Sequence, residues 1–395
     1  MIPTRYDRIA LKPWHVVLAL CAAYALLTLA AHGGDPMAFV AMGNLCDLPP
    51  PADTEAVEGY DGQFAYRIAA DPLNAHAIIN RCDVAAYRYQ RILYPELARV
   101  LALGQVNLLP WAMLLINLAA IPVGTYCLER LLMRQRVSRW YALSYGLFGG
   151  TLIGLRLDLT EPLVGALALG ALWALAAARP WLGAGLLALA ALGKETALLM
   201  AGGWLLYLLA ARRWREAIRY GALAAGPFAL WQIALWAWLG SPGVGSGGAK
   251  ATPFEWFPYN GVWRIVTDPA VRAALGRDEG GAALPALAVI AGLAAAVAVL
   301  PSAWALAQSS LDLRAGWRAR ETPHLYVFLL FAHAAVMPFV PFSTYREPLG
   351  VMRFVVGLVM ATVLYGAAAR RPRALNNFLI LWTVTLLYAL GYAFA

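Results

Sequence analysis

The sequence is short of charge. Only 13% of its 395 residues are Asp, Glu, Lys or Arg, about half the share found in a soluble globular chain. Apolar residues make up 61% of the chain, and the mean hydropathy is +0.61. Apolar runs of about 18 or more residues, long enough to cross a bilayer, recur along the whole length. The shortage of charge therefore excludes an ordinary soluble protein and predicts an all-α, polytopic membrane protein.

Cysteine is also scarce, with four in the chain, and no Cys/His spacing resembles a metal site. Cys21 and Cys127 fall in or at the end of apolar runs, where a small buried side chain is the ordinary interpretation. Cys46 and Cys82 both fall in the first long polar segment. An oxidising exterior would allow a disulfide between these two. Sequence supplies no geometry, so a bridge and a pair of free thiols both stay open.

We predict a single transmembrane domain, 1–395, without a soluble domain or a short-period repeat. Two long connections, 32–106 and 240–281, separate the spans. The first apolar run could be a signal peptide, but its core is long and Thr28-Leu29-Ala30 is a poor cleavage site, which favours an uncleaved anchor. The eleven predicted spans cover about 14–31, 107–128, 140–157, 162–178, 181–193, 196–211, 218–239, 282–306, 324–341, 348–369 and 374–393.

The net charge is +9, and the basic residues are distributed unevenly among the connections between the predicted spans. One set of alternate connections holds 18 of the 31 basic residues but only five acidic ones. Short connections rich in Lys and Arg stay in the cytoplasm, so the N-terminus should be cytoplasmic and both long loops should face outward. No nucleic-acid-binding motif accompanies the charge, and we expect no nucleic-acid partner.

The segment 181–211 is ambiguous. Its 31 residues could form one long tilted helix or two short spans that turn at Gly193-Lys194-Glu195. One helix would place the arginines after it on the outer side and invert everything downstream. The charge bias favours two spans, although 181–193 is short for a full crossing.

Both outer loops have a distinctive composition. The first begins polar and proline-rich, and from Asp61 it becomes amphipathic, which predicts short helices lying at the membrane interface. The second begins SPGVGSGGAK, a flexible stretch. It continues with an aromatic cluster: Phe254, Trp256, Phe257, Tyr259 and Trp263.

Ionisable residues gather at the predicted outer ends of the spans. Charges near hydrocarbon are expensive, and they usually serve a site or pair with one another. Simpler interpretations exist for each group: a local ion pair, a turn at a span end, or a helix start at Pro348. Together they favour a cationic pocket for a phosphorylated, lipid-borne substrate, because Arg binds phosphate in a fork. The groups are Arg156, Asp158 and Glu161 in GLRLDLTEP; Lys194 and Glu195 in ALGKETALL; and Arg346, Glu347 and Arg353 in STYREPLGVMRF.

The stretch GYDGQFAYR, residues 59–67, places Asp61 just outside the first span. A carboxylate at the membrane surface, with Arg and Tyr neighbours, can act as general base for a hydroxyl nucleophile. Gly62 would leave room for a substrate to approach the backbone. The alternative is an Asp-Gly turn in which Asp61 only caps a helix.

Two first-loop elements, GYDGQFAYRIAADPL and AYRYQRILYPELA, resemble small bacterial members of the GT-C superfamily of membrane glycosyltransferases. The elements DLTEP, GKETALL and YREPLGVMR are similar to the polar membrane-edge elements of these enzymes, and the likeness runs from about residue 12 to 370. It implies a GT-C-like fold and a polyprenyl-phosphate-linked sugar donor. It also implies a glycan or lipid acceptor and an active site on the periplasmic face of a bacterial inner membrane. Ala65 departs from the pattern, which often has a second aromatic residue there.

The resemblance makes Asp61 the catalytic base of an inverting transfer. Implied donor-phosphate contacts are Arg88, Arg91, Lys194, Arg346 and Arg353. Gln63, Tyr66 and Glu195 would contact sugar hydroxyls. Further substrate-binding candidates are Tyr60, Arg67, Asp158 and Glu161. No cofactor is certain, and a divalent cation is possible but not favoured.

Two other classes of function stay open. A polytopic transporter or lipid-linked-sugar flippase would also place charges at the membrane edge, but such proteins often show a two-fold internal repeat, and none is visible here. A non-catalytic membrane assembly partner is the third interpretation.

Overall fold

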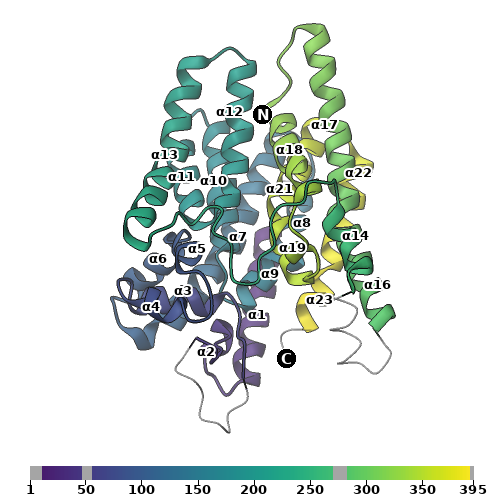
Figure 1. Cartoon of the computed structure of the whole chain (residues 1–395). Helices are drawn as coiled ribbons and strands as arrows, with labels where there is room; N and C mark the ends of the chain where they lie inside the picture. The colour runs from purple at the N-terminus through teal and green to yellow at the C-terminus, as the bar shows by residue number, and fades with distance from the viewer. Residues whose placement is uncertain (1–10, 47–55, 270–282, 392–395) are drawn as a thin grey trace.

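The computed structural model describes residues 11–46, 56–269 and 283–391. Within these ranges the chain is helical and contains no strand. The helices stand side by side as a bundle, and a group of short helices, α2 to α6, lies at one end of it (Figure 1). The prediction of an all-α membrane protein is therefore confirmed at the level of fold class.

Five helical stretches in the described ranges are long and apolar enough to cross a membrane. A sixth would be formed by α20 (Pro348–Phe354) and α21 (Val356–Ala368), which meet at a bend of 44°. The five stretches are α1 (Pro13–Ala31), Val106–Arg134 with α7 (Leu109–Arg134), α13 (Trp214–Leu239), Leu287–Ala319 with α17 (Leu300–Ala319), and Pro372–Gly391 with α22 (Pro372–Val384) and α23 (Leu386–Gly391).

Four shorter apolar helices fill the bundle between the long ones. Helix α10 contacts α7 and α11, whereas α12 contacts α13 and α18. Short helices can be tolerated at membrane depth where neighbouring protein covers their ends. The four are α10 (Glu161–Ala176), α11 (Pro180–Gly193), α12 (Leu198–Ala210) after the turn Glu195–Ala197, and α18 (Leu325–Val336) before the turn Met337–Phe339.

The predicted span 140–157 is divided into short pieces. These are a 3-10 turn, Arg139–Ala142, then α8 (Leu143–Gly146) and α9 (Gly149–Arg156). The chain becomes extended at Phe148. Just after it, the N–H of Gly149 donates to Thr385 Oγ1 at 2.8 Å. A tertiary contact with the last helices therefore interrupts a run that looks continuous in sequence.

The ambiguous segment 181–211 contains two helices. Lys194 is extended, with φ −159° and ψ 131°, and it separates α11 from the turn that leads into α12. The hydroxyl of Thr160 donates to the carbonyl of Gly193 at 3.0 Å and so satisfies the end of α11. The alternative of one long helix is wrong.

The short helices of the first loop pack on one another around Phe64, Ile68, Ile79 and Tyr89. A disulfide between Cys46 and Cys82 fastens this group. In Figure 1 it lies at the lower end of the bundle, whereas the connections α12–α13 and α17–α18 lie at the upper end. The helices of this group are α2 (Met37–Val40), α3 (Gly62–Ala70), α4 (Ala75–Ile79), α5 (Ala85–Tyr89) and α6 (Leu93–Leu101).

Two adjacent glycines of α12 allow a matched test of this packing. A Cβ at Gly203 would lie 2.9 Å from Leu329 Cα and 3.0 Å from Phe328 O, both backbone atoms of α18, whereas a Cβ at Gly202 meets nothing within 4 Å. Gly203→Ala should lower the free energy of unfolding by about 1–3 kcal/mol, because α12 and α18 must separate. Gly202→Ala should leave it unchanged or raise it slightly. Thermal unfolding in detergent compares them, and equal stability of the two variants would contradict the close approach of α12 and α18.

Candidate functional site

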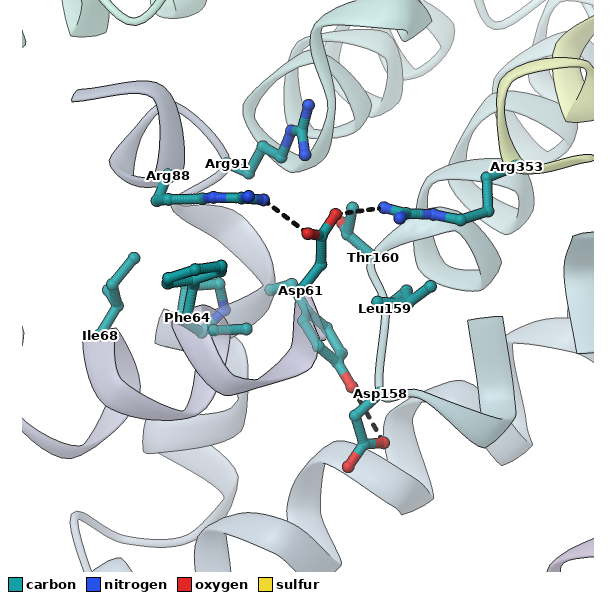
Figure 2. Close-up of a pocket in the computed structure, with 12 residues that line it drawn as sticks. Asp61, Phe64, Ile68, Arg88, Arg91, Asp158, Leu159, Thr160 and Arg353 are labelled. Carbon is teal, nitrogen blue, oxygen red and sulfur yellow. Dashed lines mark hydrogen bonds and ion pairs between the residues drawn. The ribbon is translucent and has the colours of Figure 1, made fainter. Parts of the chain in front are cut away.

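The carboxylate of Asp61 lies between two arginines at the start of α3. Oδ1 is 2.8 Å from a terminal nitrogen of Arg88, and Oδ2 is 2.8 Å from a terminal nitrogen of Arg353 (Figure 2). The side chain makes no capping hydrogen bond to the helix. The structure therefore gives Asp61 an ion-pairing role in place of the helix-capping role that the sequence left open.

Two glycines on either side of Asp61 let the chain fold tightly here. Gly59 has φ +69°, in the left-handed region that glycine adopts without strain. A Cβ at Gly62 would lie 2.3 Å from the carbonyl oxygen of Leu157. The expectation that Gly62 makes room for a substrate is wrong, because the segment before Asp158 already fills that space.

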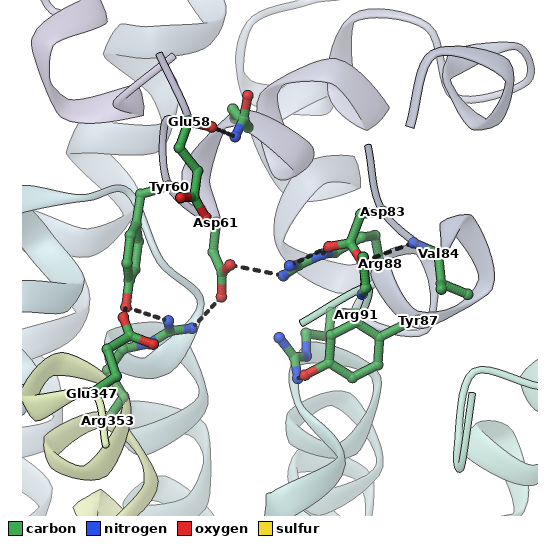
Figure 3. Close-up of polar contacts among 12 residues, drawn as sticks. Glu58, Tyr60, Asp61, Asp83, Val84, Tyr87, Arg88, Arg91, Glu347 and Arg353 are labelled. Carbon is green, nitrogen blue, oxygen red and sulfur yellow. Dashed lines mark hydrogen bonds and ion pairs between the residues drawn. The ribbon is translucent and has the colours of Figure 1, made fainter. Parts of the chain in front are cut away.

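Arg88 is oriented by carboxylates and an aromatic ring. Its Nε donates to Asp83 Oδ2 at 2.6 Å, and its guanidinium lies over the Phe64 ring, 4.1 Å from the ring centre. The other oxygen of Asp83 accepts from the N–H groups of Val84, at 2.8 Å, and Ala249, at 2.7 Å (Figure 3). Asp83 thus fixes Arg88 and also ties the second long loop (240–281) to the first (32–106).

Arg353 is held by three partners from distant parts of the chain. Besides Asp61, its Nε donates to Glu161 Oε1 at 2.7 Å, and one terminal nitrogen donates to the hydroxyl of Tyr60 at 3.2 Å. Tyr60 in turn donates to Glu347 Oε1 at 2.5 Å (Figure 3). The result is one connected network that joins the first loop to α10 and α20.

Two more cations border this network. Lys194 donates to Glu161 Oε1 at 2.6 Å. Arg91 donates to both oxygens of Glu195, at 3.0 and 2.7 Å, and to the hydroxyl of Tyr87 at 3.0 Å. A forked arginine–carboxylate pair of this kind is strong and directional.

Two neighbouring cavities share Arg353. The first, about 390 Å³ including space open to solvent, has walls that include Asp61, Phe64, Arg88, Arg91 and Asp158. The second, about 460 Å³, lies among α10, α12, α18 and α21. It is mostly apolar, with Glu161 and Lys194 near Arg353 and with His333 as a further polar wall residue. A charged pocket and an apolar cavity thus meet at one arginine.

The charges of the site compensate one another. Burial alone would raise the pKa of Asp61, but Arg88, Arg353 and Arg91 outweigh burial and hold that pKa well below its ordinary value. Asp61 is therefore ionised at neutral pH and, in this arrangement, a weak base. Burial raises the pKa of Tyr60 well above its ordinary value, so its hydroxyl stays protonated and can donate to Glu347.

Asp158 is the most unusual residue of the pocket. It is fully buried, and it has φ +46°, a left-handed conformation that is uncommon for a residue with a Cβ. The hydroxyl of Tyr94 lies 3.5 Å from its Oδ1, while its Oδ2 has no hydrogen-bond partner in the described part of the chain. Strained backbone and unsatisfied buried polar atoms both occur preferentially at functional sites.

The structure gathers many of the predicted site residues and excludes others. Gln63 accepts from the N–H of Gly43 and donates to the carbonyl of Glu58, so it holds a turn. Arg346 is exposed and lies over the Phe342 ring. Tyr66 and Arg67 line neither cavity. The predicted residues that line a cavity or pair with one that does are Tyr60, Asp61, Arg88, Arg91, Asp158, Glu161, Lys194, Glu195 and Arg353.

Sequence does not single out three side chains of the site. Phe64 stacks on Arg88, Asp83 orients it, and Tyr94 meets Asp158. Tyr94 falls within the RYQRILYP element and could have been found there. Arg156, which the sequence groups with Asp158 and Glu161, lines neither cavity and donates to the carbonyl of Ala38 at 2.7 Å.

No group of three or more His, Cys, Asp or Glu side chains that could hold a metal ion occurs among the residues that the structure describes. Neither a protein-family model, nor a curated protein, nor a solved structure matches the chain. Function must therefore be inferred from the site.

Two arginines of STYREPLGVMRF provide a test of the network. Arg353→Gln should lower the free energy of unfolding by roughly 3 kcal/mol, because Asp61 and Glu161 each lose a cation in a buried setting. Arg346→Gln should change it by less than about 0.5 kcal/mol, because that side chain is exposed. Chemical or thermal unfolding of the two variants in detergent measures the difference. Equal effects would mean that the Arg353 pairs do not hold the site together.

Proposed function

We propose that the chain is a membrane glycosyltransferase of the GT-C type. It would move a sugar from a polyprenyl-phosphate donor to a glycan or lipid acceptor on the outer face of a bacterial inner membrane. The observation that carries the proposal is the carboxylate of Asp61 set between Arg88 and Arg353, beside Arg91, in a pocket that adjoins an apolar cavity. Eleven spans and a cytoplasmic N-terminus belong to the same proposal, and the Arg-rich connections at the end opposite the first loop support them.

The donor phosphate would take the place of carboxylates. Guanidinium groups that already bind carboxylate oxygens at 2.7–3.0 Å are spaced to bind phosphate oxygens. Arg88, Arg91 and Arg353 line one pocket, so a single phosphate could reach all three. The donor phosphodiester carries one negative charge, equal to that of each carboxylate it would displace, and a second charge develops on this phosphate as its bond to the sugar breaks.

Exchange of partners would also activate Asp61. Once Arg88 and Arg353 turn to the phosphate, the charges that depress the pKa of Asp61 are partly neutralised, and its basicity rises. Asp61 then takes the proton of an acceptor hydroxyl, and that oxygen bonds to the anomeric carbon. The bond from this carbon to the phosphate oxygen breaks, and its electron pair leaves with polyprenyl phosphate. The arginines stabilise the charge that grows on the leaving group.

The apolar cavity supports a lipid-borne substrate. It begins at Arg353, Glu161 and Lys194 and continues along Val164, Met200 and Met360 between helices at membrane depth. Because the two cavities share Arg353, a ligand with its phosphate in the first cavity would have the second, apolar cavity beside it. A charged pocket beside an apolar one suits a polyprenyl phosphate, which joins a phosphate to an apolar chain.

Asp61→Asn is the decisive substitution. With purified protein in nanodiscs and a panel of polyprenyl-phosphate sugars, release of polyprenyl phosphate should fall roughly 100-fold or more, the usual contribution of a general base. Donor binding should be kept or become tighter, because asparagine does not compete as an anion for Arg88 and Arg353.

Glu58→Gln is the matched control. Glu58 lies three residues away, is exposed and pairs with Lys250, so its loss should leave turnover unchanged. Full turnover by Asp61→Asn would refute the base. If the wild-type chain instead carries lipid-linked sugar across a vesicle membrane without releasing polyprenyl phosphate, the flippase interpretation would replace the transferase.

A further inference from the structure

The second outer loop carries an exposed aromatic ridge: Phe254, Trp256, Phe257 and Trp263. Trp256 is 95% exposed and Phe257 is 77% exposed, far more than large apolar side chains usually are. Neither residue lines the pocket or the apolar cavity. None of these four side chains has a role in the proposed sugar transfer.

The ridge is held in place by the body of the protein. The N–H of Glu255 donates to the carbonyl of Phe339 at 2.9 Å, and the N–H of Tyr259 donates to the carbonyl of Pro338 at 2.6 Å. The carboxylate of Glu255 accepts from Asn260 at 2.7 Å and from Arg264 at 3.0 Å. The N–H groups of Glu255 and Tyr259 and the Glu255 carboxylate are thus satisfied within the protein, while the rings beside them are exposed.

Helix α14 (Asn260–Thr267) continues the ridge. It is amphipathic: Gly261 and Ile265 are buried, and Trp263 points outward. A Cβ at Gly261 would lie 2.9 Å from a ring carbon of Tyr345, so α14 is seated closely on α19 (Phe342–Tyr345). Figure 1 places α14 on the outside of the bundle.

Arg346 supplies a charge beside the ridge. Its guanidinium lies 5.5 Å from the centre of the Phe342 ring, and that of Arg264 lies 4.4 Å from the same centre. Arg264 is paired with Glu255 and Asp268. Arg346, in contrast, is exposed and forms no salt bridge within the described ranges. An available cation therefore borders an apolar aromatic surface.

We infer that the aromatic ridge inserts into the bilayer interface on the side of the first loop, with Arg346 bound to the phosphate of a phospholipid there. Trp favours this layer because its ring is apolar with one polar group, and Phe is common on the apolar face of segments that lie in the interface. The ridge hydrogen-bonds to the turn Met337–Phe339, which follows the apolar helix α18, so it is fixed at one end of the helical bundle. The charge of Arg346 complements a lipid phosphate, which selects phospholipid as the occupant.

Insertion would affect the candidate site through α19 and α20. Helix α14 packs on α19, and α20, which follows it, carries Arg353. A lipid-anchored ridge would therefore steady the segment that brings Arg353 to Asp61. Insertion of the ridge would steady this segment whatever reaction the site carries out.

Spin labels can measure the depth of the ridge. Cys21 and Cys127 are buried, and Cys46 and Cys82 are bridged, so an introduced exposed cysteine is the one that reacts. In nanodiscs of phosphatidylethanolamine and phosphatidylglycerol, a label at Trp256→Cys should relax faster with oxygen than with a water-soluble nickel chelate. A label at Lys250→Cys, six residues earlier and 67% exposed, should show the reverse. Greater accessibility of position 256 to the nickel chelate would overturn the inference.

Thermal unfolding in detergent tests Arg346. Added phosphatidylglycerol should raise the Tm of the wild-type chain, and Arg346→Gln should lose at least half of that shift. Arg81→Gln, at another exposed arginine, should keep the full shift. An equal shift in Arg346→Gln would overturn the assignment of the phosphate contact. An equal rise in Tm with inorganic phosphate would show that Arg346 binds phosphate in general and would overturn the assignment of a phospholipid.

Discussion

The assembly of the site depends on the guanidinium of Arg353. One terminal nitrogen binds Asp61, the other binds Tyr60, and Nε binds Glu161. These partners belong to the first long loop and to α10, about 190 to 290 residues away in the chain. Each carboxylate would be costly to bury without its cation. Because Arg353 lies on α20, the first loop can take this position only when α20 is packed in its place. Any other arrangement would leave a buried carboxylate without its cation.

Hydrophobic patterning predicted the class of fold because membrane helices need long apolar runs and little else. It identified the long helices and, through the charge bias, favoured the break at Lys194 that the structure contains. It did not predict the interruption at Phe148, because that break depends on Thr385, more than 200 residues away. The residues around Phe148 give no indication of the contact with Thr385.

Much of the site was predictable for a related reason: ionisable residues in an apolar chain are conspicuous. Asp61, Arg88, Glu161 and Arg353 all meet at the pocket or its border. Sequence could not tell which way a polar side chain points, so Gln63 was placed with Asp61 although it supports a turn behind it. It also gave no reason to select Asp83, since an aspartate in a polar loop is ordinary.

The disulfide between Cys46 and Cys82 has a consequence for how the protein matures. It joins positions 36 residues apart, encloses α3 and α4, and ends beside Asp83, the residue that orients Arg88. Thiols remain reduced in a cytosolic environment and oxidise outside it. On the topology proposed above, the first loop reaches an oxidising compartment only after it has crossed the membrane, so the bond would form after insertion. Maturation of the site would then require the thiol-oxidising capacity of that compartment in addition to insertion of the chain.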